Sequence, residues 1–245
     1  MGTSANWTAR ALCAAAIACG ATLFAADKPA KEKESAPENK ALKTEQPAKP
    51  DEAVLKPAGD GWLAVLSTKD LSGLKAEPEF WKVEEGGVLH GVTPGGAKHH
   101  YSYTEKSDYD NFELHADVKL VGYNSGICIR IAPTDFDNVP GYQVDMGDGY
   151  WGCLWDERGR NIKVGDYPKD KAEKILHKND WNHYYVRANG HHIEMWLNGV
   201  KTVDVVDEKG RLTGPIGFQL CHGGSSTDAS FKNVVYRPLK AEAGK

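Results

Sequence analysis

Apolar and polar side chains alternate one by one along several stretches of the chain. The clearest stretches are 112–119, 127–132, 142–147, 193–198 and 216–221. A period of two residues is that of a β-strand with one buried face, and the Asn198-Gly199 pair at the end of one stretch predicts a tight hairpin turn. Residues 169–177 offer a short helical pattern. We therefore predict an all-β fold, a two-sheet antiparallel β-sandwich of the jelly-roll type.

The polar positions of these stretches differ from those of a plain solvent face. They hold the following side chains: Glu113, His115, Asp117, Arg130, Gln143, Asp145, Glu194, Trp196 and Gln219. Planar polar groups pair with neighbouring sugar hydroxyls, and an indole stacks on a sugar ring. We expect such residues to line a sugar-binding face of one sheet, while the pattern leaves open which strands share that sheet. The alternative is an ordinary solvated face.

The first 60 residues differ in composition from the rest. Residues 11–26 are mostly apolar over a length that fits a secretory signal and is short for a membrane span. We predict a signal peptide over 1–26, with a lipoprotein signal ending at Cys19 as the alternative. Residues 27–60, rich in Lys, Glu, Ala and Pro, predict a disordered linker. A folded domain is expected over 61–240 and a tail over 241–245, in a protein exported to the periplasm or the extracellular space.

The charge and the cysteine content of the chain argue against several kinds of protein and site. The formal net charge is −4 at pH 7, without the basic surplus of nucleic-acid-binding proteins, so we expect no nucleic-acid partner. After removal of the signal, the chain keeps Cys128, Cys153 and Cys221, an odd number that predicts at most one disulfide. The sequence has no CxxC or HExxH spacing that would indicate a zinc site.

A series of segments between 61 and 239 resembles the 3-keto-disaccharide hydrolase domain family. The segments are GWLAVLSTKDLSG, FWKVEEGGVLHG, YDNFELHADVKL, NSGICIRI, PGYQVDMGD, NDWNHYYVRANGHHIEMWLNG and GPIGFQLCHGG, in that order. The resemblance implies the concanavalin A-like lectin/glucanase sandwich and an exported protein that cleaves 3-keto-glycosides by base-assisted elimination and hydration. A ketone at C3 acidifies the C2 proton, so the site needs a base, donors for the ketone oxygen and an acid for the leaving oxygen.

The resemblance assigns roles to three residues of two motifs. In NSGICIR, the guanidinium of Arg130 is expected to hold a sugar hydroxyl or the enolate oxygen; the alternative is a structural ion pair with Asp145. The strand at 141–145 reads GYQVD, with Gln143 where relatives commonly carry Glu and Asp145 where they carry Gln. Compared with relatives, the carboxylate lies two positions further along the same face of the strand, so Asp145 is the candidate base. The alternative is a chain that binds sugar without cleaving it.

The resemblance also singles out histidines. His222, after the strand of Gln219, is the first candidate for general acid or base, because imidazole titrates near neutral pH. His100, in a Gly-rich loop, is a candidate at the rim of the site. Together with Glu113, His115 and Asp145, these histidines could bind a divalent metal that polarises the ketone; no cofactor is established by the sequence.

Two tryptophans complete the candidate site. Trp151 and Trp155 follow the strand of Asp145 in a Gly-rich loop that suits stacking on a sugar ring, with core packing as the alternative. The predicted function is therefore an exported hydrolase or lyase acting on a carbohydrate. The alternative is a non-catalytic, lectin-like binding module. The sequence fixes neither the glycan nor the oligomeric state.

Overall fold

The computed structural model describes residues 50–221, 223 and 225–240. The predicted signal peptide, the tail and His222 lie outside these residues. Of the predicted linker, 50–60 is described: the Asp51 amide donates to the Gly199 carbonyl at 2.8 Å, and Arg237 Nη1 donates to the Ala58 carbonyl at 3.0 Å. Because residues before Gly61 make these contacts with the domain, the folded part of the chain starts earlier than the composition predicts.

Eight strands form the first sheet, and every pair in it is antiparallel. Seven of them follow the order β13-β12-β11-β6-β15-β4-β3, and β1 also pairs with β15. Their bounds are β1 Leu63–Ala64, β3 Trp81–Glu84, β4 Val88–Thr93, β6 Phe112–Gly122, β11 Asn182–Asn189, β12 His192–Leu197, β13 Val200–Val206 and β15 Thr227–Pro238.

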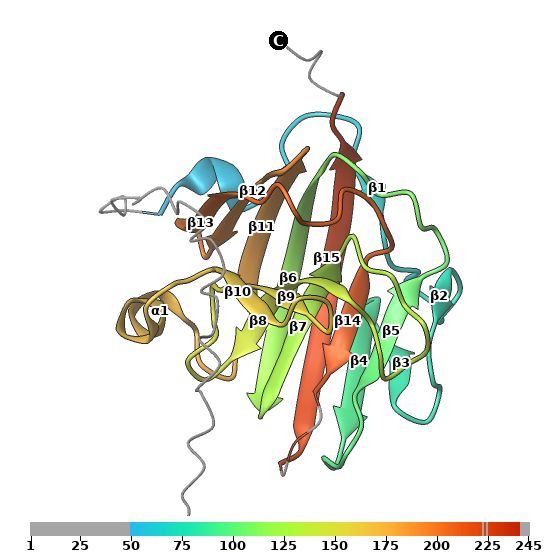
Figure 1. Ribbon diagram of the computed structural model, residues 1–245. Coiled ribbons are helices and arrows are strands. Elements are labelled where there is room, and N and C mark those ends of the chain that lie inside the picture. The colour runs from blue at the N-terminus through green and yellow to red at the C-terminus, as the bar shows by residue number, and fades with distance from the viewer. Residues whose placement is uncertain (1–49, 222, 224, 241–245) are drawn as a thin grey trace, which may run out of the picture. The chain divides into compact units, whose positions relative to one another are not determined.

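The second sheet has seven antiparallel strands in the order β10-β9-β8-β7-β14-β5-β2. Their bounds are β2 Leu74–Lys75, β5 His100–Thr104, β7 Asn124–Ile129, β8 Gly141–Gly147, β9 Leu154–Glu157, β10 Ile162–Gly165 and β14 Gly217–Leu220. A 3-10 turn, η1, spans Glu52–Val54, and α1 spans Lys169–Ile175 within the predicted helical stretch. The two sheets pack face to face, which confirms the predicted all-β sandwich (Figure 1).

The core lies between the two sheets. The apolar members of the alternating stretches point into it, as Leu114, Val144 and Met195 do with at most 1% of their surface exposed. Burying each such side chain contributes roughly 1.5–3 kcal/mol. The predicted turn is also present: Asn198 and Gly199 have φ of 49° and 81°, the positive values that a type I′ hairpin turn needs.

A second, smaller apolar cluster covers part of the seven-stranded sheet on its other side. Tyr101, Tyr103 and Cys128 form it with Ile131 and Val139 of the connection from β7 to β8, and Phe136 packs on it. The Tyr101 amide donates to the Phe136 carbonyl at 2.9 Å. This connection therefore shields one end of the outer face, and the polar residues described next lie beside it.

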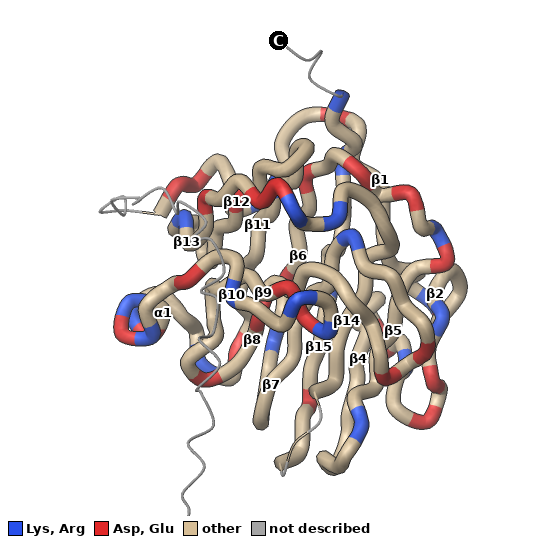
Figure 2. The backbone as a smooth tube through the Cα atoms, viewed as in Figure 1, with Lys and Arg blue, Asp and Glu red and all other residues tan. Residues whose placement is uncertain are grey.

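Lys and Arg are interspersed with Asp and Glu over the described domain (Figure 2). Within the described residues, no helix is long and apolar enough to cross a bilayer.

Candidate functional site

Polar side chains gather on the outer face of the seven-stranded sheet. Gln143 and Asp145 alternate with the core residues of β8, so their side chains point away from the core. The outer face also holds Gln219 of β14 and Tyr101 of β5, which are cross-strand partners. All four are at most 6% exposed. The structure thus brings three sequence-predicted residues, Gln143, Asp145 and Gln219, onto one face.

A chain of hydrogen bonds fixes the amides of this group. Gln219 Nε2 donates to the Tyr101 hydroxyl at 2.7 Å, and Gln143 Nε2 donates to Gln219 Oε1 at 2.8 Å. Gln143 Nε2 also donates to the Ser125 carbonyl at 3.3 Å. Because its NH₂ is engaged in this way, Gln143 presents its carbonyl oxygen as a directed acceptor.

Gly126 makes room for this arrangement. A Cβ added to Gly126 would lie 2.5 Å from Gln143 Nε2, much closer than the atoms could remain. Because Gly126 of β7 has no side chain, Gln143 can lie across that neighbouring strand and reach Gln219.

Trp155 supplies a donor beside this acceptor. It is the register partner of Gln143 on β9, so the two side chains share a face. Within the described part of the chain, neither the buried Trp155 Nε1 nor the buried Gln143 Oε1 has a hydrogen-bond partner. An unsatisfied buried polar atom costs about 1–3 kcal/mol. The indole N–H can donate one hydrogen bond, and the amide oxygen can accept one.

Asp145 is the titratable group of the site. Burial raises its pKa to about 7, although Asn124 Nδ2, which donates to Oδ1 at 2.8 Å, acts in the opposite direction. The negative charge of Glu157 raises the pKa further. A carboxyl that titrates near neutral pH can both take up and release a proton during a reaction.

Three further residues complete the polar surroundings. Glu157 ends β9, Arg158 follows it, and His99 precedes β5 with 2% exposure. His99 Nε2 lies 4.0 Å from Glu157 Oε1. Burial raises the pKa of Tyr101 well above its ordinary value; the charge of Glu157 adds to this shift and that of Arg158 opposes it. Residues 154–157 read Leu-Trp-Asp-Glu, two apolar residues followed by two polar ones, so no period-two pattern marks this strand in the sequence.

Glu113 and His115 do not belong to this site, and the prediction of one shared polar face is wrong for them. Both lie on β6, on the outer face of the other sheet. Glu113 accepts from the Tyr185 hydroxyl at 2.6 Å and pairs with Arg237. His115 Nδ1 lies 2.9 Å from His183 Nε2. The hydrophobic core separates them from Asp145, so these residues cannot share one metal ion.

Arg130 is also absent from the cluster. Its φ of 52° interrupts the strand alternation just after β7, so that its neighbour Ile131 joins the outer apolar cluster instead. The guanidinium is fully buried and donates to the carbonyls of Asp110 and Gly190, at 2.9 Å and 2.7 Å. It forms no ion pair with Asp145 within the described residues. Through these hydrogen bonds, Arg130 connects the backbone segments that carry Asp110 and Gly190.

The remaining candidates divide in a similar way. Trp151 is 9% exposed and stacks on Tyr184 in the core, which was the alternative interpretation. His100 stacks on Phe80, and its Nδ1 lies 2.8 Å from Glu77 Oε2; the structure does not join it to Asp145. Trp155 is thus the tryptophan that the fold brings to the site.

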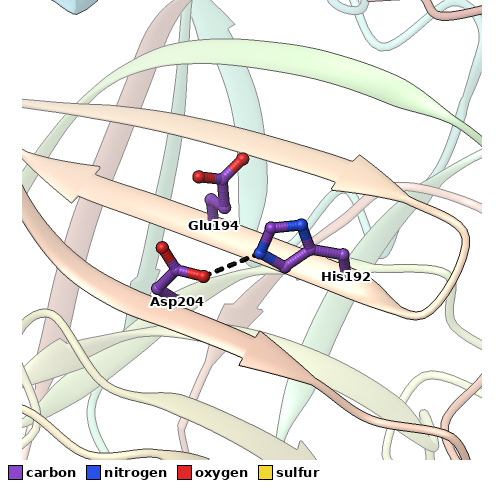
Figure 3. A group of neighbouring side chains, drawn as sticks. All are labelled: His192, Glu194 and Asp204. Carbon is purple, nitrogen blue, oxygen red and sulfur yellow. Dashed lines mark hydrogen bonds and ion pairs between the residues drawn. The ribbon is translucent and has the colours of Figure 1, made fainter. Parts of the chain in front are cut away.

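One trio of potential metal ligands converges among the described residues: His192, Glu194 and Asp204 (Figure 3). It lies on β12 and β13 of the eight-stranded sheet. Lys201 Nζ donates to Glu194 Oε1 at 2.6 Å and to Asp204 Oδ2 at 2.9 Å. The ammonium already bridges the two carboxylates, so this trio is a salt-bridge network that does not fit a cation.

Comparison with known proteins identifies the family. Residues 61–237 match the model of a family described as the 3-keto-alpha-glucoside-1,2-lyase-like domain. The chain belongs to this family. The match confirms the resemblance inferred from the ordered segments, and it supports a carbohydrate-related function. No curated protein matches the chain.

Solved structures confirm the fold of this lyase-like domain. A candidate glycosyl hydrolase from Parabacteroides distasonis is 25% identical, with a TM-score of 0.53 over 74% of this chain and 100% of that chain. The carbohydrate binding module CBM66 from Bacillus subtilis is 17% identical, with a TM-score of 0.50 over 72% and 95% of the two chains. The lumenal domain of VIP36, bound to Ca²⁺ and Man3GlcNAc, is 11% identical, with a TM-score of 0.53 over 76% and 93%.

Proposed function

We propose that the protein cleaves 3-keto-glycosides by elimination across C1 and C2, with Asp145 as the base. The observation that carries the proposal is the buried carboxyl of Asp145, with a pKa of about 7, on the same polar face as the indole N–H of Trp155 and the amide oxygen of Gln143. The family membership of residues 61–237 supports the choice of substrate.

The elimination follows from the acidity of the C2 proton. Asp145 takes that proton, and the C2–H electrons form an enolate with the C3 ketone. The enolate then expels the C1 oxygen, which gives a C1–C2 double bond and restores the ketone. The leaving oxygen takes up a proton, for which His222 remains the proposed donor. Addition of water across C1 and C2 then gives the free keto sugar.

The surroundings of Asp145 suit this sequence. Burial raises the proton affinity of the carboxylate and so makes it a stronger base than an exposed Asp. We assign the Trp155 N–H, which has no partner among the described residues, as the donor to the developing enolate oxygen; stabilisation of that charge is a large term in such reactions. Gln143 would accept from a hydroxyl of the same ring and so orient it.

A binding module is the second candidate. The similarity in fold to CBM66 favours it, because the same donor and acceptor would hold a sugar without any chemistry at Asp145. The presence of Gln at 143 and Asp at 145, where relatives commonly carry Glu and Gln, is consistent with either function. In both cases the ligand is a carbohydrate, and export of the protein, supported by the apolar segment at 11–26, is part of the proposal.

Product release from keto sugars separates the two functions. We would incubate the full-length chain with 3-keto-trehalose, 3-keto-sucrose and the parent sugars, and measure monosaccharide release. Turnover of the keto sugars alone is expected, lost in Asp145→Asn and retained in Glu113→Gln, a matched carboxylate on the opposite sheet. Sugar binding without turnover would instead support the module. Loss of activity with a chelator would show that the reaction requires a metal ion.

A further inference from the structure

A hollow separate from the polar face around Asp145 lies where β2, the end of β5 and the segments 131–133 and 211–215 meet. It has a volume of about 350 Å³, near the lower end of the range of roughly 300–1,000 Å³ that is common for small-molecule sites. Tyr103 and Ile131 of the smaller apolar cluster line it. Its size suits a single-ring ligand.

The close approach of two backbone segments shapes this hollow. A Cβ on Gly214 would collide with the Ile131 carbonyl oxygen. The Ile131 amide donates to the Pro215 carbonyl at 3.3 Å, and the Gly214 amide donates to the Tyr109 carbonyl at 3.2 Å. Because Gly214 has no side chain, the segment before β14 can lie directly against the segment after β7, and hydrogen bonds hold it there.

Arg130 orients one of the cations of the hollow. In its left-handed conformation, with φ of 52°, the carbonyl of Arg130 accepts from Arg211 Nε at 2.9 Å. In return, Arg130 Nη1 donates to the Arg211 carbonyl at 3.4 Å. The guanidinium of Arg211 is thus held at Nε, while its two Nη groups have no partner among the described residues. Two parallel N–H donors of a guanidinium match the two oxygens of a carboxylate.

The charged groups of the hollow leave an excess of positive charge. Lys75 and Arg211 line it together with one carboxylate, that of Glu105. Over the part of the chain that the structure describes, none of the three side chains forms an ion pair. Ser107 and Thr213 add hydroxyl groups, which can donate to or accept from a ligand hydroxyl. This combination suits a ligand that carries one carboxylate and several hydroxyls.

We propose that the hollow binds a hexuronic acid, with the sugar carboxylate on Arg211 and Lys75 and the sugar hydroxyls on Glu105, Ser107 and Thr213. Such an acidic sugar differs in charge from the neutral keto sugars of the proposed reaction. Binding in the hollow uses no residue of the polar face around Asp145, so it does not depend on the function proposed above.

Ligands that differ only in charge test the proposal. We would titrate the isotope-labelled full-length chain with D-glucuronate, with its uncharged counterpart D-glucuronamide and with acetate, and follow the amide signals by NMR. D-glucuronate is expected to shift the amides of Ser107, Thr213 and Gly214, with a Kd on the order of 1 mM. The other two compounds should bind at least about tenfold more weakly, because each lacks either the charge or the hydroxyls.

Variants assign the binding to the two cations. Lys75→Gln and Arg211→Gln are each expected to weaken D-glucuronate binding about tenfold. Arg211→Lys keeps the charge without the paired donors and should lie between Arg211→Gln and the original protein. Lys82→Gln, at an exposed lysine on β3 of the other sheet, should leave the Kd within about twofold. The Lys75 side chain makes no hydrogen bond within the described residues, so Lys75→Gln serves as the test if Arg211→Gln does not fold.

Equal affinity for D-glucuronate and D-glucuronamide, or an unchanged Kd in Lys75→Gln, would overturn the proposal. Acetate that binds as tightly as D-glucuronate would show that the hollow takes any small carboxylate, and the assignment to a sugar acid would then be wrong. Signal shifts confined to residues outside the hollow would place the ligand elsewhere and also contradict the proposal.

Discussion

Asp145 is held in a protonation state that an Asp in water would not have. Its pKa is about 7 in the folded chain and 3.8 for an ordinary Asp. Between these pH values the folded state retains a proton that the unfolded chain has released, so the free energy of unfolding falls as pH rises. The difference corresponds to roughly 4 kcal/mol at pH values above 7. The buried carboxyl therefore lowers the stability of the fold at pH values above 7, where it is ionised.

Asp145→Asn should remove this dependence. Asn is close in size and does not ionise, so we expect the variant to exceed the original protein in free energy of unfolding at pH 8 and to approach it at pH 4. Urea unfolding of both proteins across this pH range measures the difference. Parallel curves would show that Asp145 does not titrate in this range. Stability gained together with activity lost is the outcome expected of a functional carboxyl.

Single residues also show where sequence patterns stop being informative. The alternation along 127–132 would put Arg130 on the same face as Cys128, but the positive φ of Arg130 reverses that choice. Nothing in the sequence marks the reversal, because Arg has no preference for such a conformation. In contrast, the alternation along β8 correctly predicts that the side chains of Gln143 and Asp145 point away from the core.

At the scale of the elements, β7 and β8 form the support of the site. Gly126→Ala would place a methyl group where Gln143 Nε2 lies, so Gln143 must turn away from Gln219. We expect a KM several-fold higher with a smaller change in kcat, since Asp145 remains in place. Gly165→Ala is the matched control: its Cβ would press on Val203 in the core, and should lower thermal stability without changing KM. An unchanged KM in Gly126→Ala would mean that Gln143 does not contact substrate.

The sequence patterns do not show which strands pair with one another. β6 and β8 show the same alternation of apolar and polar residues, and the strand class was predicted for both. Their sheets are decided by pairings between distant segments, such as β6 with β15 and β8 with β9. Period-two patterns carry no information on such partners, so Glu113 and His115 were grouped with Asp145. The short β9 and its Glu157 were missed because residues 154–157 do not alternate between apolar and polar side chains.

The whole sandwich should unfold as one unit, and two buried thiols can report on this. Cys153 lies in the core between the sheets, and Cys128 in the cluster under the connection from β7 to β8. Burial raises the pKa of both thiols, so alkylation requires opening. We expect both to be labelled at the same slow rate, read by mass spectrometry of the peptides. Faster labelling of Cys128 would show that this connection opens alone.

The contact of Asp51 with the Gly199 carbonyl has a mechanical consequence. The chain upstream of Pro50 joins the domain beside the turn between β12 and β13, within the eight-stranded sheet. A pull transmitted along that upstream chain would first load this hairpin, while the strands that carry Gln143, Asp145 and Trp155 belong to the other sheet. Force applied through that upstream chain would thus be borne by the eight-stranded sheet and would leave the arrangement of Gln143, Asp145 and Trp155 unchanged.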